Sequence, residues 1–256
     1  MVFQRAKYKR HDDPSLKKTV WISHRGFTAN AVENTCSAFA AAVDIGFSAL
    51  ETDLRITKDD HIVLIHDETI DRLANDCRRV RDLTRRELES FHLAHGEQFF
   101  FFEQFTEAFN NCSWTFDIKP ENGNQTIQAL AAWAQKNDFV KQLCQQAKFL
   151  TWKPDHETLL KLYFPWADCY AKKIECWRAG LSVLCHMPVL GSIKPGRTYA
   201  LPPFFGGISL YKKSIVRPFH KQKAKTIAFL PKTDFLAQKA VTAGFDEILT
   251  NGFILY

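Results

Sequence analysis

The chain has 256 residues, of which 46% are hydrophobic, and it carries a formal net charge of +6 at pH 7. These values suit one soluble domain with its own core, and no run of 18 apolar residues predicts a membrane-spanning helix. Lysines and arginines are spread along the chain rather than gathered in one tract, which argues against nucleic acid as a partner. A phosphate-bearing small substrate, or a transient contact with an anionic membrane surface, fits the charge equally well.

The first 18 residues are basic and polar, and they lack the apolar stretch and cleavage site of a secretory signal. We therefore predict a basic N-terminal extension over residues 1–18, followed by a domain over residues 19–256, and a cytoplasmic location. The seven cysteines form no Cys-x-x-Cys pair or Cys/His cluster, so the sequence does not indicate zinc.

Short apolar or β-branched runs alternate with helical patterns along the whole domain. The expected strands are residues 20–24, 49–55, 115–119, 148–153, 168–172, 207–211, 226–230 and 247–250. The expected helices are residues 34–45, 84–91, 102–110, 125–136, 156–163, 173–178, 214–222 and 235–243. Eight alternating units predict an α/β fold, a closed (β/α)8 TIM barrel in a single domain, rather than an open doubly wound sheet.

Polar and charged residues stand at the ends of the first three expected strands. In a barrel, reactive groups gather at the C-terminal ends of the strands. The residues in question are His24, Arg25, Glu51, Asp53, Asp117 and Lys119. Glu51 and Asp53 are two positions apart, so both side chains leave the same face of a strand and point into the barrel. Two carboxylates in a core need a neutralising cation, and Mg²⁺ or Ca²⁺ is the natural partner for oxygen ligands.

Four short motifs follow one another in a specific order. They are His24-Arg25-Gly26, Glu33-Asn34-Thr35, Glu51-Thr52-Asp53-Leu54 and the run from His66 to Arg72, with Arg81 to Leu88, Phe116 to Pro120 and Ala243 to Asn251 as further matches. This ordered set resembles the glycerophosphodiester phosphodiesterases. The likeness is good over residues 19–120 and 206–252 and poor over residues 174–205, and Asp117 stands where that family usually has glutamate.

The resemblance implies a barrel hydrolase that cleaves glycerophosphodiesters to glycerol phosphate and an alcohol with the help of a divalent metal. It assigns the metal ligands to Glu51, Asp53 and Asp117. It assigns catalysis to His24 and His66, and phosphate binding to Arg25 and Lys119. Two imidazoles of near-neutral pKa suit this chemistry, because one proton must be removed and another supplied. The residues themselves do not say which histidine is the acid.

Alternatives stay open at this point. The enzyme could be a lysophospholipase D or a cyclising phospholipid lyase of the same barrel type, or a catalytically silent member that binds phosphodiesters. Asp117 and Lys119 could form a structural ion pair, Arg25 and Arg55 could simply neutralise the carboxylates, and Glu33 could cap the helix over residues 34–45 instead of contacting substrate. The phenylalanines at 99–102 and 105 favour packing on the barrel flank over a lipid-docking loop.

Overall fold

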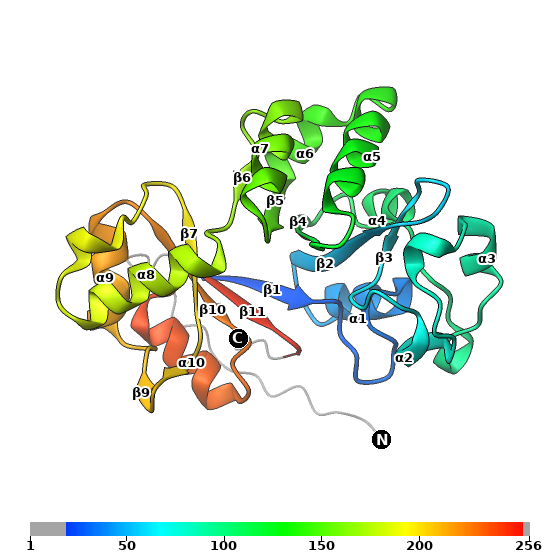
Figure 1. Cartoon of the computed structure of the whole chain (residues 1–256). Helices are drawn as coiled ribbons and strands as arrows, with labels where there is room; N and C mark the ends of the chain where they lie inside the picture. Colours follow the sequence, from blue (N-terminus) through cyan, green and yellow to red (C-terminus); the bar gives the residue numbers. More distant parts are fainter. Residues whose placement is uncertain (1–18, 253–256) are drawn as a thin grey trace, which may run out of the picture.

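Eight parallel strands form the centre of the molecule. The computed structural model describes residues 19–252, so the predicted extension over residues 1–18 lies outside the described part (Figure 1). The strands follow the order β6-β5-β4-β2-β1-β11-β10-β7, and a parallel bridge from Tyr170 to Thr198 joins β6 to β7 and completes the ring. Their bounds are β1 Val20–His24, β2 Ala49–Ile56, β4 Ser113–Ile118, β5 Ala147–Thr151, β6 Asp168–Cys169, β7 Thr198–Leu201, β10 Lys225–Phe229 and β11 Glu247–Thr250. The predicted barrel is confirmed.

Helices surround the strands, with α8, α9 and α10 at the left of Figure 1, α5, α6 and α7 at the top, and α1 to α4 at the right. Their bounds are α1 Cys36–Asp44, α2 Asp71–Ala74, α3 Arg85–Glu89, α4 Phe102–Ala108, α5 Gly123–Lys136, α6 Val140–Gln146, α7 Pro154–Tyr163, α8 Lys173–Leu184, α9 Lys213–Lys221 and α10 Asp234–Ala243, with short 3-10 turns η1 Val80–Asp82, η2 Ala94–Gly96 and η3 Pro188–Gly191. Each predicted helix is present, whereas α2 and α6 were not predicted. Among the described residues, no helix has the length and apolar character needed to cross a membrane.

One predicted barrel strand is wrong. Residues 207–211 do not join the barrel, because Ile208–Ser209 (β9) pairs antiparallel with Phe204–Phe205 (β8) in a separate hairpin. Gly206 and Gly207 form the turn with φ of 53° and 78°, values that suit glycine and favour a two-residue hairpin. The barrel strand is instead β7, whose Tyr199 is buried in the core. A further short strand that was not predicted, β3 (Ile62–Leu64), pairs antiparallel with β2.

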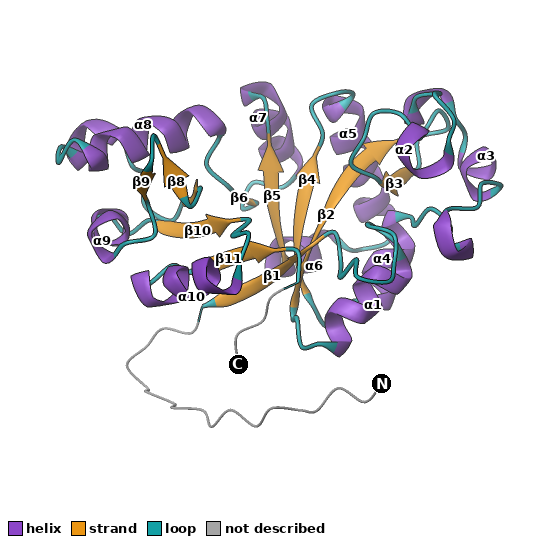
Figure 2. Cartoon of the chain, turned by 90° about the horizontal axis from the view of Figure 1, so that it is seen from below, coloured by secondary structure: helices purple, strands orange, loops and turns teal. Residues whose placement is uncertain are grey.

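The barrel interior is packed beneath its C-terminal rim. Ile22, Ile227 and Leu249 belong to one buried apolar cluster with Tyr170, whose hydroxyl donates to Glu247 at 2.8 Å. On the flank, Phe99–Phe102 and Phe105 are buried, which confirms their predicted packing role. Figure 2 shows the arrowheads of β2, β4 and β5 directed to the same side of the molecule. Polar side chains near the strand ends therefore stand on a filled core and face the mouth of the barrel.

Candidate active site

Three buried carboxylates form the centre of the site. Glu51 and Asp53 lie on β2 and Asp117 on β4, and the parallel register pairs Asp53 with Asp117. One oxygen from each carboxylate lies within 4.8 Å of the other two, and all three residues are at most 5% exposed. The two-residue spacing on β2 and the register with β4 therefore bring all three groups to one point inside the barrel.

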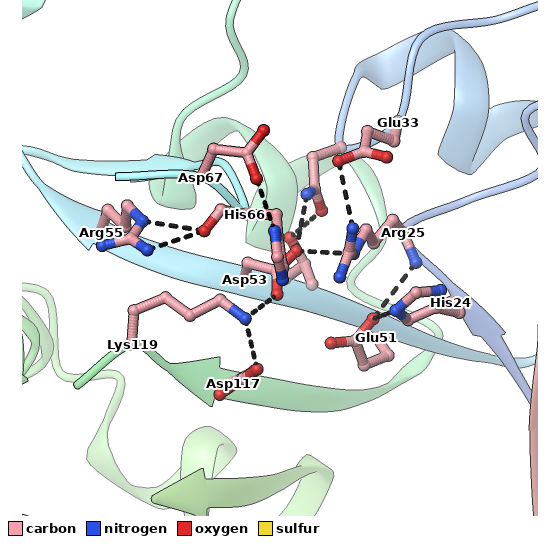
Figure 3. A network of polar contacts seen from close by, with 12 residues as sticks. His24, Arg25, Glu33, Glu51, Asp53, Arg55, His66, Asp67, Asp117 and Lys119 are labelled. Carbon is pink, nitrogen blue, oxygen red and sulfur yellow. Dashed lines mark hydrogen bonds and ion pairs between the residues drawn. The ribbon is translucent and has the colours of Figure 1, made fainter. Parts of the chain in front are cut away.

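Two cationic side chains contact this cluster. Lys119 Nζ lies 2.6 Å from an oxygen of Asp53 and 2.6 Å from an oxygen of Asp117. Arg25 Nε lies 2.9 Å from the second oxygen of Asp53 (Figure 3). The ion pair between Asp117 and Lys119 that the sequence left open is thus present, but Lys119 also reaches Asp53. Both cations converge on the carboxylates.

The carboxylates differ in their tendency to hold a proton. Burial, with Asp53 and Asp117 nearby, raises the pKa of Glu51 well above its ordinary value. Burial also acts to raise the pKa of Asp53, but Lys119 and Arg25 outweigh it and the net pKa is lowered. Glu51 has no lysine or arginine side chain in ion-pair contact among the described residues. The ring nitrogen Nε2 of His24 lies 3.9 Å from its carboxylate. Of the three carboxylates, Glu51 is therefore the one whose negative charge no lysine or arginine side chain of the described residues neutralises by direct contact.

His24 lies at the end of β1, close to Glu51. Its Nδ1 is 2.6 Å from Oδ1 of Asn251, the residue that follows β11. Burial and the charge of Arg25 lower the pKa of His24, so the ring is mainly neutral at pH 7. The next residue, Arg25, has a φ of 59° and donates its backbone N–H to Glu51. This turn directs the His24 and Arg25 side chains toward the carboxylates (Figure 3).

His66 stands in the loop after β3 and is joined to the first motif by a chain of polar contacts. Its Nδ1 lies 2.7 Å from Asp67, and Asp67 accepts from Arg72 at 2.6 Å. Arg72 also donates to Glu33, which accepts from Arg25 at 3.2 Å. Glu33 does not cap α1, because Thr35 is the N-cap. The capping alternative for Glu33 is wrong, and the Glu33 side chain instead links Arg25, next to His24, with Arg72 in the segment after His66.

A match to a known protein family covers the whole site. The model of the glycerophosphoryl diester phosphodiesterase family matches residues 24–253, which include every site residue described above. The chain belongs to this family.

Curated relatives from the family match a shorter part of the chain. A glycerophosphodiester phosphodiesterase of Caldanaerobacter subterraneus subsp. tengcongensis is 43% identical over 84 residues, which is 32% of this chain and 35% of that protein. A human lysophospholipase D is 43% identical over 70 residues, 27% of this chain and 22% of that one. The matched segment thus spans about a third or less of the length of these two relatives.

Solved structures of family members share the fold. The glycerophosphoryl diester phosphodiesterase domain of a Mycobacterium tuberculosis protein superposes with a TM-score of 0.76 at 16% identity, covering 91% of this chain and 96% of that one. A glycerophosphodiester phosphodiesterase from Agrobacterium tumefaciens gives a TM-score of 0.71 at 18% identity, with 91% and 96% covered. At this identity the likeness establishes the barrel and not the substrate.

Four residues contact the predicted site residues in ways that the sequence did not predict, although Arg55 was offered there as a neutralising partner of the carboxylates. Asn34 donates to Asp53 at 2.9 Å, Trp152 Nε1 donates to Asp117 at 2.7 Å, Asn251 contacts His24, and Arg55 donates twice to the backbone oxygen of His66. Signals for three of them were available. Trp152 and Asn251 directly follow β5 and β11, and Arg55 is two residues beyond Asp53 on the same strand face.

The donor set fits a hard divalent cation. It consists of three carboxylates whose oxygens are close enough to share one ion. Lys119 and Arg25 supply two positive charges against three carboxylates, and Glu51 lies outside their ion pairs. Oxygen-rich sites of this kind suit Mg²⁺ or Ca²⁺.

Proposed function

We propose that this chain hydrolyses glycerophosphodiesters to glycerol phosphate and an alcohol. The supporting observation is the convergence of two histidines, three carboxylates, an arginine and a lysine at one barrel mouth, in a chain of this family. We further propose that the domain over residues 19–256 carries the whole catalytic site. The substrate is then a small phosphodiester whose phosphate enters between the loops that follow β1 and β3.

In this proposal Glu51, Asp53 and Asp117 hold one Mg²⁺ or Ca²⁺. Such an ion, when bound, offsets the negative charge that develops on the phosphate oxygens. Arg25 and Lys119 also offset this negative charge. The Arg25 guanidinium and the Lys119 ammonium group already lie at the cluster and can donate to a phosphate oxygen. Glu33 orients Arg25 through its contact at 3.2 Å.

His24 and His66 are proposed to carry the two proton transfers. His24 is neutral at pH 7 and therefore suits the role of base, which takes the proton of the attacking oxygen. That oxygen belongs either to water or to the neighbouring glycerol hydroxyl. His66, held by Asp67 at 2.7 Å, then donates a proton to the leaving alcohol oxygen. The contact with Asp67 fixes the orientation of the ring for this transfer.

The test is a panel of glycerophosphocholine, glycerophosphoethanolamine, glycerophosphoinositol and lysophosphatidylcholine, each with and without Mg²⁺ or Ca²⁺. Phosphorus NMR identifies the products. We expect glycerol phosphate from at least one glycerophosphodiester, and turnover at least ~100-fold slower in the His24→Ala variant. A wild-type chain that binds these diesters without turning over any of them would support the silent alternative and contradict the proposal.

A second candidate activity is that of a lysophospholipase D. One relative with this printed name is 43% identical over 70 residues. The large apolar side chains exposed around part of the barrel mouth also suit a substrate with an acyl chain. The lysophosphatidylcholine arm of the panel decides, because release of choline there would extend the substrate range to lysolipids.

A further inference from the structure

Large apolar side chains are exposed on loops that follow four neighbouring barrel strands. β5, β6, β7 and β10 are consecutive in the ring, so the loops after them form one arc of the mouth. Seven side chains on this arc are between 42% and 74% exposed, and we call them the apolar rim: Trp152 after β5, Ile174 and Trp177 at the start of α8, Phe204 and Ile208 in the β8–β9 hairpin, Phe229 at the end of β10 and Phe235 at the start of α10. Exposed apolar groups gathered in one region indicate an interaction surface.

The hairpin is held in place from behind. Phe205 packs edge-on against Trp177 of α8, with ring centroids 5.1 Å apart, and Figure 2 shows the hairpin beside α8. Behind it lies an apolar cavity of about 120 Å³ that Leu201 and Leu210 help to line. The two glycines of the turn keep the connection short. Phe204 and Ile208 are therefore presented to solvent by an anchored element rather than by a loose loop.

Unpaired lysines accompany the apolar rim on the same loops. Five of them are exposed and form no ion pair with any described residue: Lys153, Lys173, Lys212, Lys213 and Lys232. The exposed acids on these loops are Asp155 and Asp234. This arc of the mouth is thus both apolar and positively charged, a combination that matches a surface with apolar depth and negative charge.

The other side of the mouth has a different character. There Glu33, Asp67 and Arg72 pair with one another and with Arg25, so the loops after β1 and β3 present satisfied polar groups. The apolar rim meets the site at Trp152, whose ring is 47% exposed while its Nε1 donates to Asp117. Any surface that covers the rim therefore lies next to the carboxylate cluster.

We propose that the barrel mouth docks onto an anionic membrane surface through the apolar rim and its five lysines. The rim side chains stand on four separate loops around an arc, rather than lining one groove that would seat a helix or strand of a protein partner. A lipid interface accepts such scattered side chains, and the lysines meet the anionic headgroups. This partner is additional to the proposed hydrolysis of soluble diesters, and docking is measured without turnover.

The experiment is flotation of the full chain with large unilamellar vesicles. One set contains phosphatidylcholine alone, and the other contains three parts phosphatidylcholine to one part phosphatidylglycerol. We expect binding to the anionic vesicles, weaker binding to the neutral ones, and loss of most binding in 0.5 M NaCl because salt screens the lysines. Activity on glycerophosphocholine, assayed separately, tells a failure of docking from a failure of the proposed function.

Matched variants locate the surface. Phe204→Ser with Ile208→Ser should lower the partition coefficient by about tenfold or more, because two exposed apolar side chains that would enter the lipid interface are lost. The control is Val189→Ser with Leu190→Ser, which removes two still more exposed side chains on η3, near the amino end of β7 and away from the mouth. Lys212→Gln with Lys213→Gln should weaken binding about fivefold per lysine, whereas Lys136→Gln with Lys141→Gln, at the end of α5 and the start of α6, should not.

Three results would overturn the proposal. They are no flotation with either vesicle set, equal losses in the η3 control and the hairpin variant, and concentration-dependent self-association that the hairpin variant abolishes without any vesicle binding. The last result would assign the rim to contacts between copies of the chain. Circular dichroism melting curves verify that each variant is folded before its binding is read.

Discussion

At the scale of single residues, His24 ends β1 and His66 lies in the loop after β3, and polar contacts through Glu33 join these two segments. We predict that His24→Ala and His66→Ala each lower kcat by at least ~100-fold, the usual scale for acid-base groups. The double variant should lose much less than the product of the two, because both act on one proton-transfer sequence. Steady-state turnover of glycerophosphocholine measures this. Wild-type kcat in either single variant would make that histidine structural.

The pH profile tests the role of His24 as the base. Burial and Arg25 lower its pKa, and a bound cation acts in the same direction, so the ring loses its proton below pH 6.5. Activity that needs the neutral ring should therefore persist below pH 6.5 and fall only as the pH drops through the lowered pKa. A profile of kcat/KM against pH measures the acidic limb. An acidic limb whose midpoint lies clearly above pH 6.5 would contradict the role of His24 as the base.

A variant of Arg25 tests whether this residue binds the phosphate, as proposed, or only forms a structural ion pair with Asp53. Its Nε lies 2.9 Å from Asp53, which Lys119 also neutralises. Arg25→Ala should lower kcat/KM by about 100-fold and weaken inhibition by glycerol phosphate, since it removes charge stabilisation from ground and transition states alike. Arg79→Ala, on an exposed pair with Asp82, is the matched control and should leave both values unchanged. Unaltered product inhibition in Arg25→Ala would exclude it from the phosphate site.

At the scale of elements, β2 positions two of the three proposed metal ligands, Glu51 and Asp53, and the loop that bears His66. Arg55, at its C-terminal end, is 8% exposed and donates to the His66 carbonyl at 3.0 and 2.8 Å. Arg55→Leu should lower kcat by about 10- to 100-fold with little change in KM, because the His66 loop loses its anchor. In the background of His66→Ala the same change should cost almost nothing more. Additive losses would show that Arg55 does not act through His66.

A network of ion pairs connects α7, α8 and the segment that leads into β7, away from the carboxylate cluster. Burial acts to raise the pKa of Glu175, but the Lys172 backbone N–H, Lys194 and Arg197 outweigh it and hold the pKa at about 2. A lowered carboxylate pKa adds stability above the unfolded pKa of about 4.3, and this stability is lost as the pH falls toward 2. Glu175→Gln should therefore reduce the free energy of unfolding by about 1–3 kcal/mol at pH 7 and by much less at pH 3.

Urea titrations at pH 7, 5 and 3 measure this difference. Glu89→Gln serves as the control, because Glu89 forms an exposed pair with Arg85 four residues away and should contribute little at any pH. A Glu175→Gln penalty that is the same at all three pH values would show that packing, rather than ionisation, accounts for the effect.

The elements also show what a pattern of residues can predict. Val20–His24 and Glu247–Thr250 coincide with the predicted strands, because apolar runs bounded by polar residues leave little freedom. The sixth barrel strand, β7, is misplaced in the prediction, because Thr198–Leu201 is only four residues long and the longer apolar run after Gly206 resembles a strand equally well. Gly206-Gly207 carried the correct signal, that of a tight hairpin turn.

At the scale of the whole molecule, the barrel was predictable because eight alternating units permit few other arrangements. Closure then brings together residues from distant parts of the chain, so the contact between His24 and Asn251 could not be read from local spacing. The same holds for Trp152 and Asp117, whose strands are neighbours in the sheet. The rule that reactive groups stand at strand ends locates such residues, but only the fold shows which ones touch.

The central claim is that the buried cluster of Glu51, Asp53 and Asp117 works with a divalent ion in phosphodiester cleavage. The most direct measurement is the turnover of glycerophosphocholine by protein stripped with EDTA, followed as Mg²⁺ or Ca²⁺ is added, with the metal content determined by mass spectrometry. We predict no turnover in the stripped protein, recovery on addition of one of the two ions, and no recovery in Glu51→Gln. Full turnover in excess EDTA, with no metal detected in the protein, would contradict the account.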